Sequence, residues 1–79
     1  MNLCFLMGKI ISNIEFNFML ESHHISIATF EVLLNNKSVI HVKAYDEIAD
    51  KCYKELVKSD EVAIQGYLNR NMELIVEEI

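Results

Sequence analysis

Apolar and polar side chains alternate along residues 39–45, the stretch "VIHVKAY". The even-numbered positions carry small or medium apolar side chains, namely Ile40, Val42 and Ala44. The odd-numbered positions carry an imidazole, an ammonium and a phenol, namely those of His41, Lys43 and Tyr45. Successive side chains of a strand point to opposite faces, so we predict a strand that buries the even set and leaves the odd set together on its outer face.

The N-terminal segment is predicted to form one strand or two. Residues 3–11 are almost continuously apolar, and residues 14–20 alternate apolar and polar positions as a half-buried strand does. The two segments could form a single long strand that bends near Ser12 and Asn13. Phe16 and Phe18 share the apolar phase of the second segment, so we expect them to pack in the core or against another subunit.

A further strand is expected over residues 25–34, after a turn at "ESHH". Its apolar residues change phase, as a bulge near Ile27 would cause. Phe30 falls in the main apolar phase and is assigned to the core. The residues "NNK" then predict a tight hairpin that leads into the strand over residues 39–45.

After Tyr45 the apolar period changes from two to about 3.6, which indicates an amphipathic helix. Its apolar face consists of Ile48, Ala49, Cys52, Tyr53, Leu56 and Val57. Asp46 suits the N-cap position, because its short polar side chain can bind the free N–H groups of the first turn. The lysines of this segment are assigned to the polar face of the helix, namely Lys51, Lys54 and Lys58.

Two final strands are predicted over residues 62–68 and 72–79, joined by the short turn "NRN". Gly8 and Gly66 lie inside apolar strand segments, where glycine costs stability unless the sheet bends sharply or another backbone approaches closely. A small closed barrel requires such bends. We therefore predict an all-β fold: a single domain over residues 1–79 that forms a five-stranded OB-fold Greek-key barrel with one helix between strands 3 and 4. The pattern also fits other five-stranded α+β folds.

The composition predicts self-association. A chain of 79 residues makes one small domain, yet 52% of its residues are hydrophobic. This surplus indicates an apolar surface that another subunit covers, and the apolar first strand is the best candidate. Cys4 and Cys52 lie in apolar segments without the spacing of a metal or redox motif, so we expect buried free thiols in a reducing compartment.

The N-terminal segment has no basic n-region and is too short to cross a bilayer, so we expect a soluble cytoplasmic protein without membrane association. The sequence shows no nucleophile paired with a base, no phosphate-cradling glycine loop and no pair of catalytic carboxylates. We therefore expect no enzymatic activity, no cofactor and no small-molecule substrate. His23 and His24 are adjacent in the sequence and lack further ligands at a supporting spacing, so no metal site is expected.

Several segments resemble the bacterial single-stranded DNA-binding protein (SSB) family. "NLCFLMGKI" is similar to the family's opening strand, and "IATFEVLLN" to its second-strand motif. "VKAYDEIADKCYKELVKSDEVAIQGYLNRN" resembles the section in which a strand ends on an aromatic residue, a helix crosses, and a strand with a central glycine returns. The resemblance covers nearly the whole chain. It implies an OB-fold homodimer or homotetramer that binds single-stranded DNA.

The sequence also departs from the family pattern. Ser59 stands where family members usually have glycine, and Val39 stands where they often have a stacking tryptophan. The hairpin "NRN" replaces a long loop, and the disordered tail with an acidic tip that recruits partner proteins is missing from the sequence. We therefore expect weaker binding over a shorter site than is usual in the family.

OB-folds hold single strands by stacking bases on aromatic faces and by placing cations along the phosphates. The resemblance assigns base stacking to Tyr45, which matches an aromatic position of the family. The candidate nucleic-acid-binding residues are Tyr45, Lys43, His41, Arg70, Tyr67, Lys9 and Lys37. Alternatively, Tyr45 covers the start of the helix, Tyr67 packs across strands, and the lysine and arginine side chains are ordinary solvated charges.

The predicted function is sequence-tolerant binding of single-stranded DNA by base stacking and phosphate neutralisation on the barrel face, as a homo-oligomer. The net charge of −5 is the main argument against it, because an acidic domain repels phosphates at long range. The alternative function is an acidic OB-type protein–protein interaction module that has lost nucleic-acid binding.

Overall fold

The structure is a computed structural model that describes residues 2–19 and 23–79. Its elements are β1 (Leu3–Ile10), β2 (Glu15–Phe18), β3 (Ser26–Leu34), β4 (Val39–Tyr45), α1 (Asp46–Glu55), β5 (Glu61–Leu68) and β6 (Leu74–Glu78). Part of the predicted turn at "ESHH" and Leu20, the end of the predicted 14–20 strand, lie outside the described residues. Within the described ranges, no helix has both the length and the apolarity that crossing a membrane requires.

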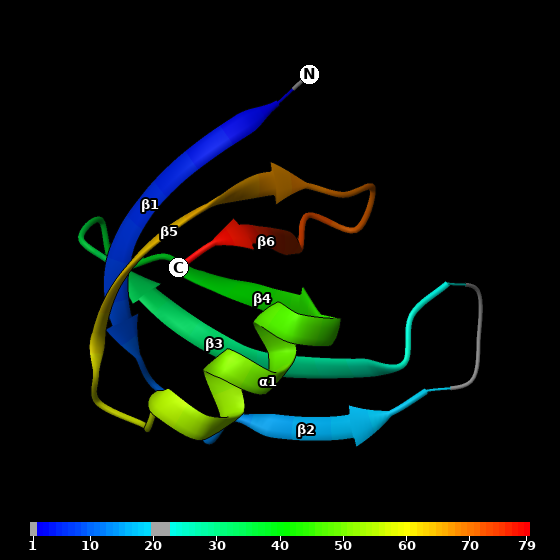
Figure 1. Cartoon of the computed structure of the whole chain (residues 1–79). Helices are drawn as coiled ribbons and strands as arrows, with labels where there is room; N and C mark the ends of the chain where they lie inside the picture. The colour runs from blue at the N-terminus through cyan, green and yellow to red at the C-terminus, as the bar shows by residue number, and fades with distance from the viewer. Residues whose placement is uncertain (1, 20–22) are drawn as a thin grey trace.

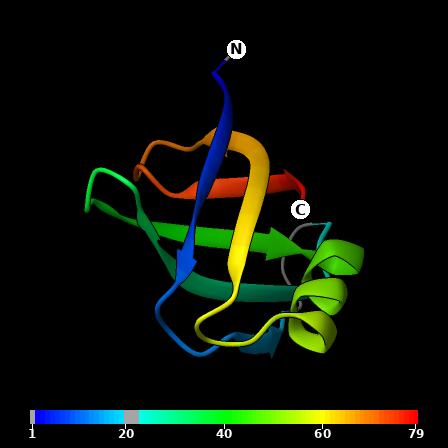
Figure 2. The same cartoon turned by 90° about the vertical axis from the view of Figure 1, so that its left-hand side faces the viewer.

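The strands form a closed barrel (Figure 1). Neighbouring strands follow the order β1-β5-β6-β4-β3-β2, and an additional pairing of β1 with β3 closes the ring. β4 and β6 pair in parallel, whereas the other described pairings are antiparallel. α1 packs against β3 and β4 at one end of the barrel, as Figures 1 and 2 show. The predicted barrel with a single helix is therefore confirmed.

β1 and β2 are two segments of one bent strand. Both run antiparallel to β3, but four residues separate Ile10 from Glu15 whereas only two separate their partners on β3. Ser12 bridges the resulting gap, because its Oγ accepts a hydrogen bond from the N–H of Glu31 at 2.8 Å. The predicted bend near Ser12 and Asn13 is confirmed. It divides the first strand in two, so that the structure has six strands and the helix follows the fourth rather than the third.

The two strand glycines lie where backbones approach closely. A Cβ atom on Gly66 would collide with the carbonyl oxygen of Ile75, and one on Gly8 would lie 2.7 Å from Cγ1 of Val32. The pairing of β5 with β6 also shifts register between Gln65 and Gly66. Close approach of a neighbouring backbone therefore explains glycine at both positions inside apolar strands, as predicted.

β3 lacks the bulge that was predicted near Ile27. Its register with β4 is continuous, beginning with Ile27 opposite Tyr45. Its even-numbered side chains face the core from Ser26 onward. The prediction was wrong because it took two apolar side chains for core residues: Ile25 is exposed, and Ile27 lies half-buried on the outer face.

Asp46 does not cap the helix as predicted. The N-cap position is Tyr45, and α1 has no side-chain cap hydrogen bond. The carboxylate of Asp46 instead accepts a hydrogen bond from the N–H of Ile25 at 2.7 Å. This outcome follows from the tertiary structure, because the start of β3 lies beside Asp46 and offers it backbone N–H groups.

The core lies inside the barrel and under α1. Its buried side chains are Ile10, Ala28, Phe30, Val32, Val42, Ala44, Ala49, Cys52, Ile64, Leu74 and Val76. Phe30 is thus in the core as predicted. Both cysteines are free thiols, but only Cys52 is buried, whereas Cys4 is half-buried. Burial raises the pKa of the Cys52 thiol to about 11.

An aromatic cluster lies between β2 and α1, and its half-buried Phe16 packs against the core as predicted. The rings of Phe16 and Tyr53 lie 5.0 Å apart, and those of Phe16 and Phe18 lie 5.4 Å apart. Phe18 is 78% exposed and Tyr53 58% exposed. Core packing is therefore wrong for Phe18, because β2 is a short strand at the edge of the sheet that α1 covers only in part.

Candidate nucleic-acid interface

The outer face of β4 carries the polar side chains that the alternation predicted. Val42 and Ala44 are buried, whereas His41 is exposed and Lys43 and Tyr45 are half-buried. A strand rises about 3.4 Å per residue, so the row from His41 to Tyr45 spans about 14 Å. The period of two thus places an imidazole, an ammonium and a phenol side by side on the surface.

A second row crosses all six strands on the same face of the sheet. In order from β2 to β1, its laterally paired residues are Glu15, Thr29, Lys43, Ile75, Tyr67 and Leu3. Paired residues point to the same side, so Tyr67 and Lys43 share the outer face with only Ile75 between them. Neighbouring strands lie about 4.8 Å apart, which places Tyr67 within about 10 Å of Lys43 across the sheet.

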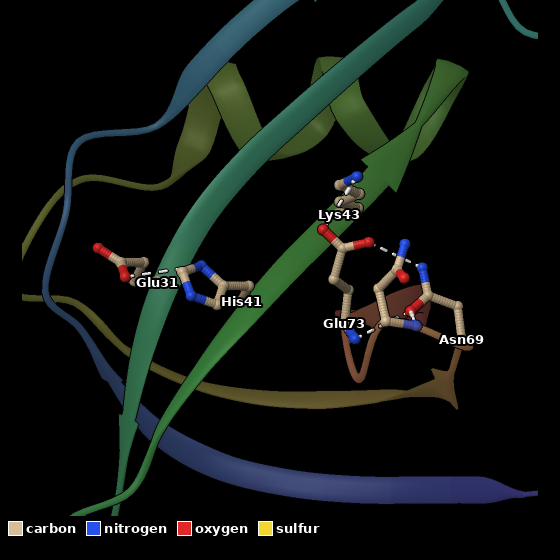
Figure 3. A network of polar contacts seen from close by, with 6 residues as sticks. Glu31, His41, Lys43, Asn69 and Glu73 are labelled. Atoms are coloured by element: carbon tan, nitrogen blue, oxygen red, sulfur yellow. Dashed lines mark hydrogen bonds and ion pairs between the residues drawn. The ribbon is translucent and has the colours of Figure 1, made fainter.

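Lys43 and His41 on β4 each lie beside a carboxylate (Figure 3). Lys43 Nζ lies 3.0 Å from Glu73 Oε2, and His41 Nδ1 lies 3.6 Å from Glu31 Oε2. Hydrogen bonds from the Asn69 amide and from the Lys43 ammonium lower the pKa of Glu73. The row therefore offers phosphates less positive charge than its sequence suggests.

A hollow of about 670 Å³ lies beside Lys43 and His41, and Lys58 also lines it. The prediction that Lys58 belongs to the helix was wrong, because α1 ends at Glu55 and Lys58 lies in the loop that follows. Lys58 has no ion pair among the described residues. It is therefore a cation of this surface that the sequence reasoning missed. Ser59 could have indicated that Lys58 lies outside the helix, because the glycine that the family usually has at this position marks a turn.

Tyr45 lies at one end of the β4 row, with the ring of His24 stacked on it. The two ring centroids are 4.2 Å apart and the ring planes are 21° from parallel. His24 Nδ1 is also 2.8 Å from Asp46 Oδ2. This side-chain hydrogen bond, together with that from the N–H of Ile25, lowers the pKa of Asp46. The contact of His24 was missed because the two rings are far apart in the sequence.

The remaining predicted cations do not line the hollow beside Lys43. Lys9 and Lys37 line a second hollow of about 360 Å³, which they share with Glu61. This hollow lies beyond the start of β4, because Lys37 is in the β3–β4 turn. Arg70 is exposed in the turn between β5 and β6. The structure thus brings Tyr45, Lys43, His41 and Tyr67 onto one face and leaves the other three predicted residues at its margins.

An exposed apolar face adjoins this surface on β1. Leu3, Phe5 and Met7 are 59%, 66% and 60% exposed. β1 pairs with β5 from Leu3 to Lys9, but with β3 only from Gly8 to Ile10. One edge of its first half is therefore unpaired within the described part of the chain. Such an apolar strand edge is a common site of contact with another chain.

The structure is similar to solved SSB domains. It superposes on the crystal structure of the SSB domain of a Synechococcus sp. protein with a TM-score of 0.86 and 19% sequence identity, covering 99% of this chain and 92% of that one. It also matches the second single-stranded DNA-binding protein, SSBb, of Mycobacterium smegmatis, with a TM-score of 0.74 and 22% identity, covering 96% of this chain and 81% of that one. No protein-family model and no curated protein matches the sequence. At this identity the comparison establishes the fold, which confirms the OB-fold of the SSB type.

Proposed function

We propose that this protein binds single-stranded DNA in a sequence-tolerant manner on the outer face of β4 and its neighbouring strands. The observation that carries the proposal is the row of His41, Lys43 and Tyr45 on the outside of an OB-fold barrel of the SSB type. OB-folds bind single strands by stacking bases on aromatic rings and by tracking the phosphates with cations. The row supplies both kinds of group within about 14 Å.

The proposal gives each group a role. A base stacks on the Tyr45 ring, either on the face that His24 leaves open or after His24 moves aside. Lys43 and Lys58 line the same hollow and neutralise neighbouring phosphates, and Lys58 has no ion pair within the described ranges. Tyr67 offers a second ring across the sheet, and Lys9 and Lys37 extend the path beyond the start of β4. Because any base can stack and because counterions are released, binding is sequence-tolerant and weakens with added salt.

The proposal includes assembly into a homodimer or homotetramer through β1. The exposed side chains of Leu3, Phe5 and Met7 and the unpaired edge of this strand support it. Tyr67 pairs with Leu3, so it lies at the boundary between the proposed subunit contact and the proposed DNA-binding face. A single chain offers a short site, and an oligomer would multiply the binding faces without any change in the barrel.

The test is fluorescence anisotropy of a labelled oligo-dT, titrated at low and at high salt. A stacked base contributes roughly 1–3 kcal/mol, so Tyr45→Ala should weaken binding by at least about fivefold. Tyr45→Phe should retain most of the affinity, because the ring remains. Tyr53→Ala, which removes an exposed tyrosine on α1, is the matched control. Equal affinity of the wild type and Tyr45→Ala would show that the site is placed wrongly.

A second candidate function is an acidic protein–protein interaction module. The observation in its favour is that carboxylates already lie against the β4 row, because Glu73 pairs with Lys43 and Glu31 lies beside His41. Glu15 adds a further negative charge to the hollow of about 670 Å³ beside Lys43 and His41. Absence of oligo-dT binding even at low salt, in folded protein, would favour this function over the first.

A further inference from the structure

The carboxylate of Glu73 fills an anion site that other residues build. Its Oε2 lies 3.0 Å from the Nζ of Lys43, and its Oε1 accepts a hydrogen bond from the Nδ2 of Asn69 at 2.9 Å. Figure 3 shows these donors converging on the one carboxylate from β4 and from the β5–β6 turn. An ammonium and an amide N–H are also the donors that a phosphate oxygen pair would use.

The Asn69 donor is held in place by the turn itself. Its Oδ1 accepts hydrogen bonds from the backbone N–H groups of Asn71 and Glu73, both at 2.9 Å. The backbone also closes the turn, because the N–H of Asn69 donates to the carbonyl oxygen of Glu73 at 3.0 Å. The amide therefore keeps its orientation if the Glu73 side chain rotates away.

We propose that Lys43 and Asn69 form a phosphate-binding site, which Glu73 occupies in the free protein and vacates when a phosphate of a single strand takes its place. This inference rests on the proposed function, and it identifies Glu73 as the residue that sets the affinity. The exchange requires only a side-chain rotation. The side chains of Lys43 and Glu73 are 31% and 19% exposed, so water screens the pair and can replace it.

The lowered pKa of Glu73 means that the carboxylate is charged at neutral pH, so the site is filled under ordinary conditions. When the carboxylate moves aside, the Lys43 ammonium neutralises the phosphate that replaces it, as it does when residue 73 carries no charge. A carboxylate that stayed paired with Lys43 would instead leave that phosphate without a counter-charge. The salt dependence therefore separates the exchange from a pair that stays closed.

The experiment compares wild type, Glu73→Gln and Glu55→Gln in oligo-dT titrations at several salt concentrations. Glu55→Gln is the matched control, because it makes the same chemical change at an exposed position of α1. Glu73→Gln should raise the affinity at low salt about fivefold, the upper range for a partly exposed pair. The slope of log K against log salt should stay equal to that of the wild type, because Lys43 neutralises the same phosphate in both complexes. In the Lys43→Ala/Glu73→Gln double variant the slope should become shallower by about 0.7, which corresponds to one phosphate fewer neutralised.

The outcomes separate the inference from the proposed function. If the wild type binds oligo-dT and Glu73→Gln behaves like Glu55→Gln, the phosphate site is wrong and the proposed function stands. A slope that steepens by about 0.7 in Glu73→Gln also overturns the exchange, because it would show that Lys43 stays paired with Glu73 in the wild-type complex. If neither the wild type nor Glu73→Gln binds at the lowest salt, both proposals fail. In unaltered protein, the ¹³C resonance of the Glu73 carboxyl group should move when oligo-dT is added, and an unmoved resonance in the complex would contradict the exchange.

Discussion

Ser59 is held in a backbone conformation that favours glycine. Its φ is 87°, in the left-handed region, and its N–H donates to the carbonyl oxygen of Ile10 at 2.8 Å. This bond joins the loop after α1 to the end of β1, so the conformation is imposed by the tertiary structure. Residues with a Cβ atom lose stability there, whereas glycine does not.

Ser59→Gly should therefore stabilise the protein, by about 0.5–1 kcal/mol after the greater chain entropy of glycine is subtracted. The measurement is the midpoint of urea denaturation. Ser38→Gly is the matched control in the β3–β4 turn, where the φ of serine is not positive, and it should lower the midpoint. A midpoint that falls equally in both variants would show that Ser59 is not strained.

At the scale of the elements, Asp46 joins the start of β3 to the start of α1. Its Oδ1 accepts from the N–H of Ile25 at 2.7 Å, and its Oδ2 lies 2.8 Å from His24 Nδ1. His24 in turn stacks on Tyr45, so one carboxylate positions both the entry to β3 and the ring proposed to stack a base. The geometry of the binding face thus depends on a contact between two elements.

Asp46→Ala should loosen this junction. The hydrogen bond from His24 is the largest cause of the lowered pKa of Asp46, so the carboxylate contributes stability above its ordinary pKa and loses it as the pH falls through the lowered value. We expect faster hydrogen exchange at the Ile25 amide and weaker oligo-dT binding through a displaced Tyr45. Asp50→Ala, an exposed position on the same helix, should change neither. An unchanged rate of hydrogen exchange at the Ile25 amide would show that Asp46 does not hold the two elements together.

The whole molecule combines an acidic surface with an exposed apolar strand face. Its net charge is −5, and within the described residues the large exposed side chains of β1 are Leu3, Phe5 and Met7. Burying these side chains in a contact between copies would remove apolar surface from water and cover the unpaired edge of β1. The hydrophobic surplus of the sequence is consistent with such a contact.

Phe5→Asp should therefore produce a monomer, because a charge cannot be buried unpaired in an apolar contact. The measurement is light scattering coupled to size-exclusion chromatography, with the wild type expected as a dimer or tetramer. Phe18→Asp is the control, since Phe18 is even more exposed, at 78%, but lies on β2. A monomeric wild type would refute the assembly, and dissociation by Phe18→Asp alone would move the contact to β2.

Local patterns were enough to predict most of the fold. Alternation identified the outer face of β4, the 3.6-residue period identified α1, and the two glycines indicated tightly bent strands, because each depends on neighbouring residues in the chain. The same local reasoning failed at Ile27, where an apolar residue faces outward, and at Lys58, where the apolar period continued past the end of the helix at Glu55.

The sequence by itself determined the barrel, its helix and the polar row on β4, since strand and helix periods are set by the chain's own geometry. Only the tertiary structure decided which groups meet that row. Closure of the barrel brings Glu73 and Asn69 to Lys43 and places Tyr67 on the same face, while the start of β3 brings His24 to Tyr45. These partners come from strands and turns that are distant in the chain. The pairing of β4 with β6 brings them together, and such a long-range pairing leaves no periodic pattern in the sequence.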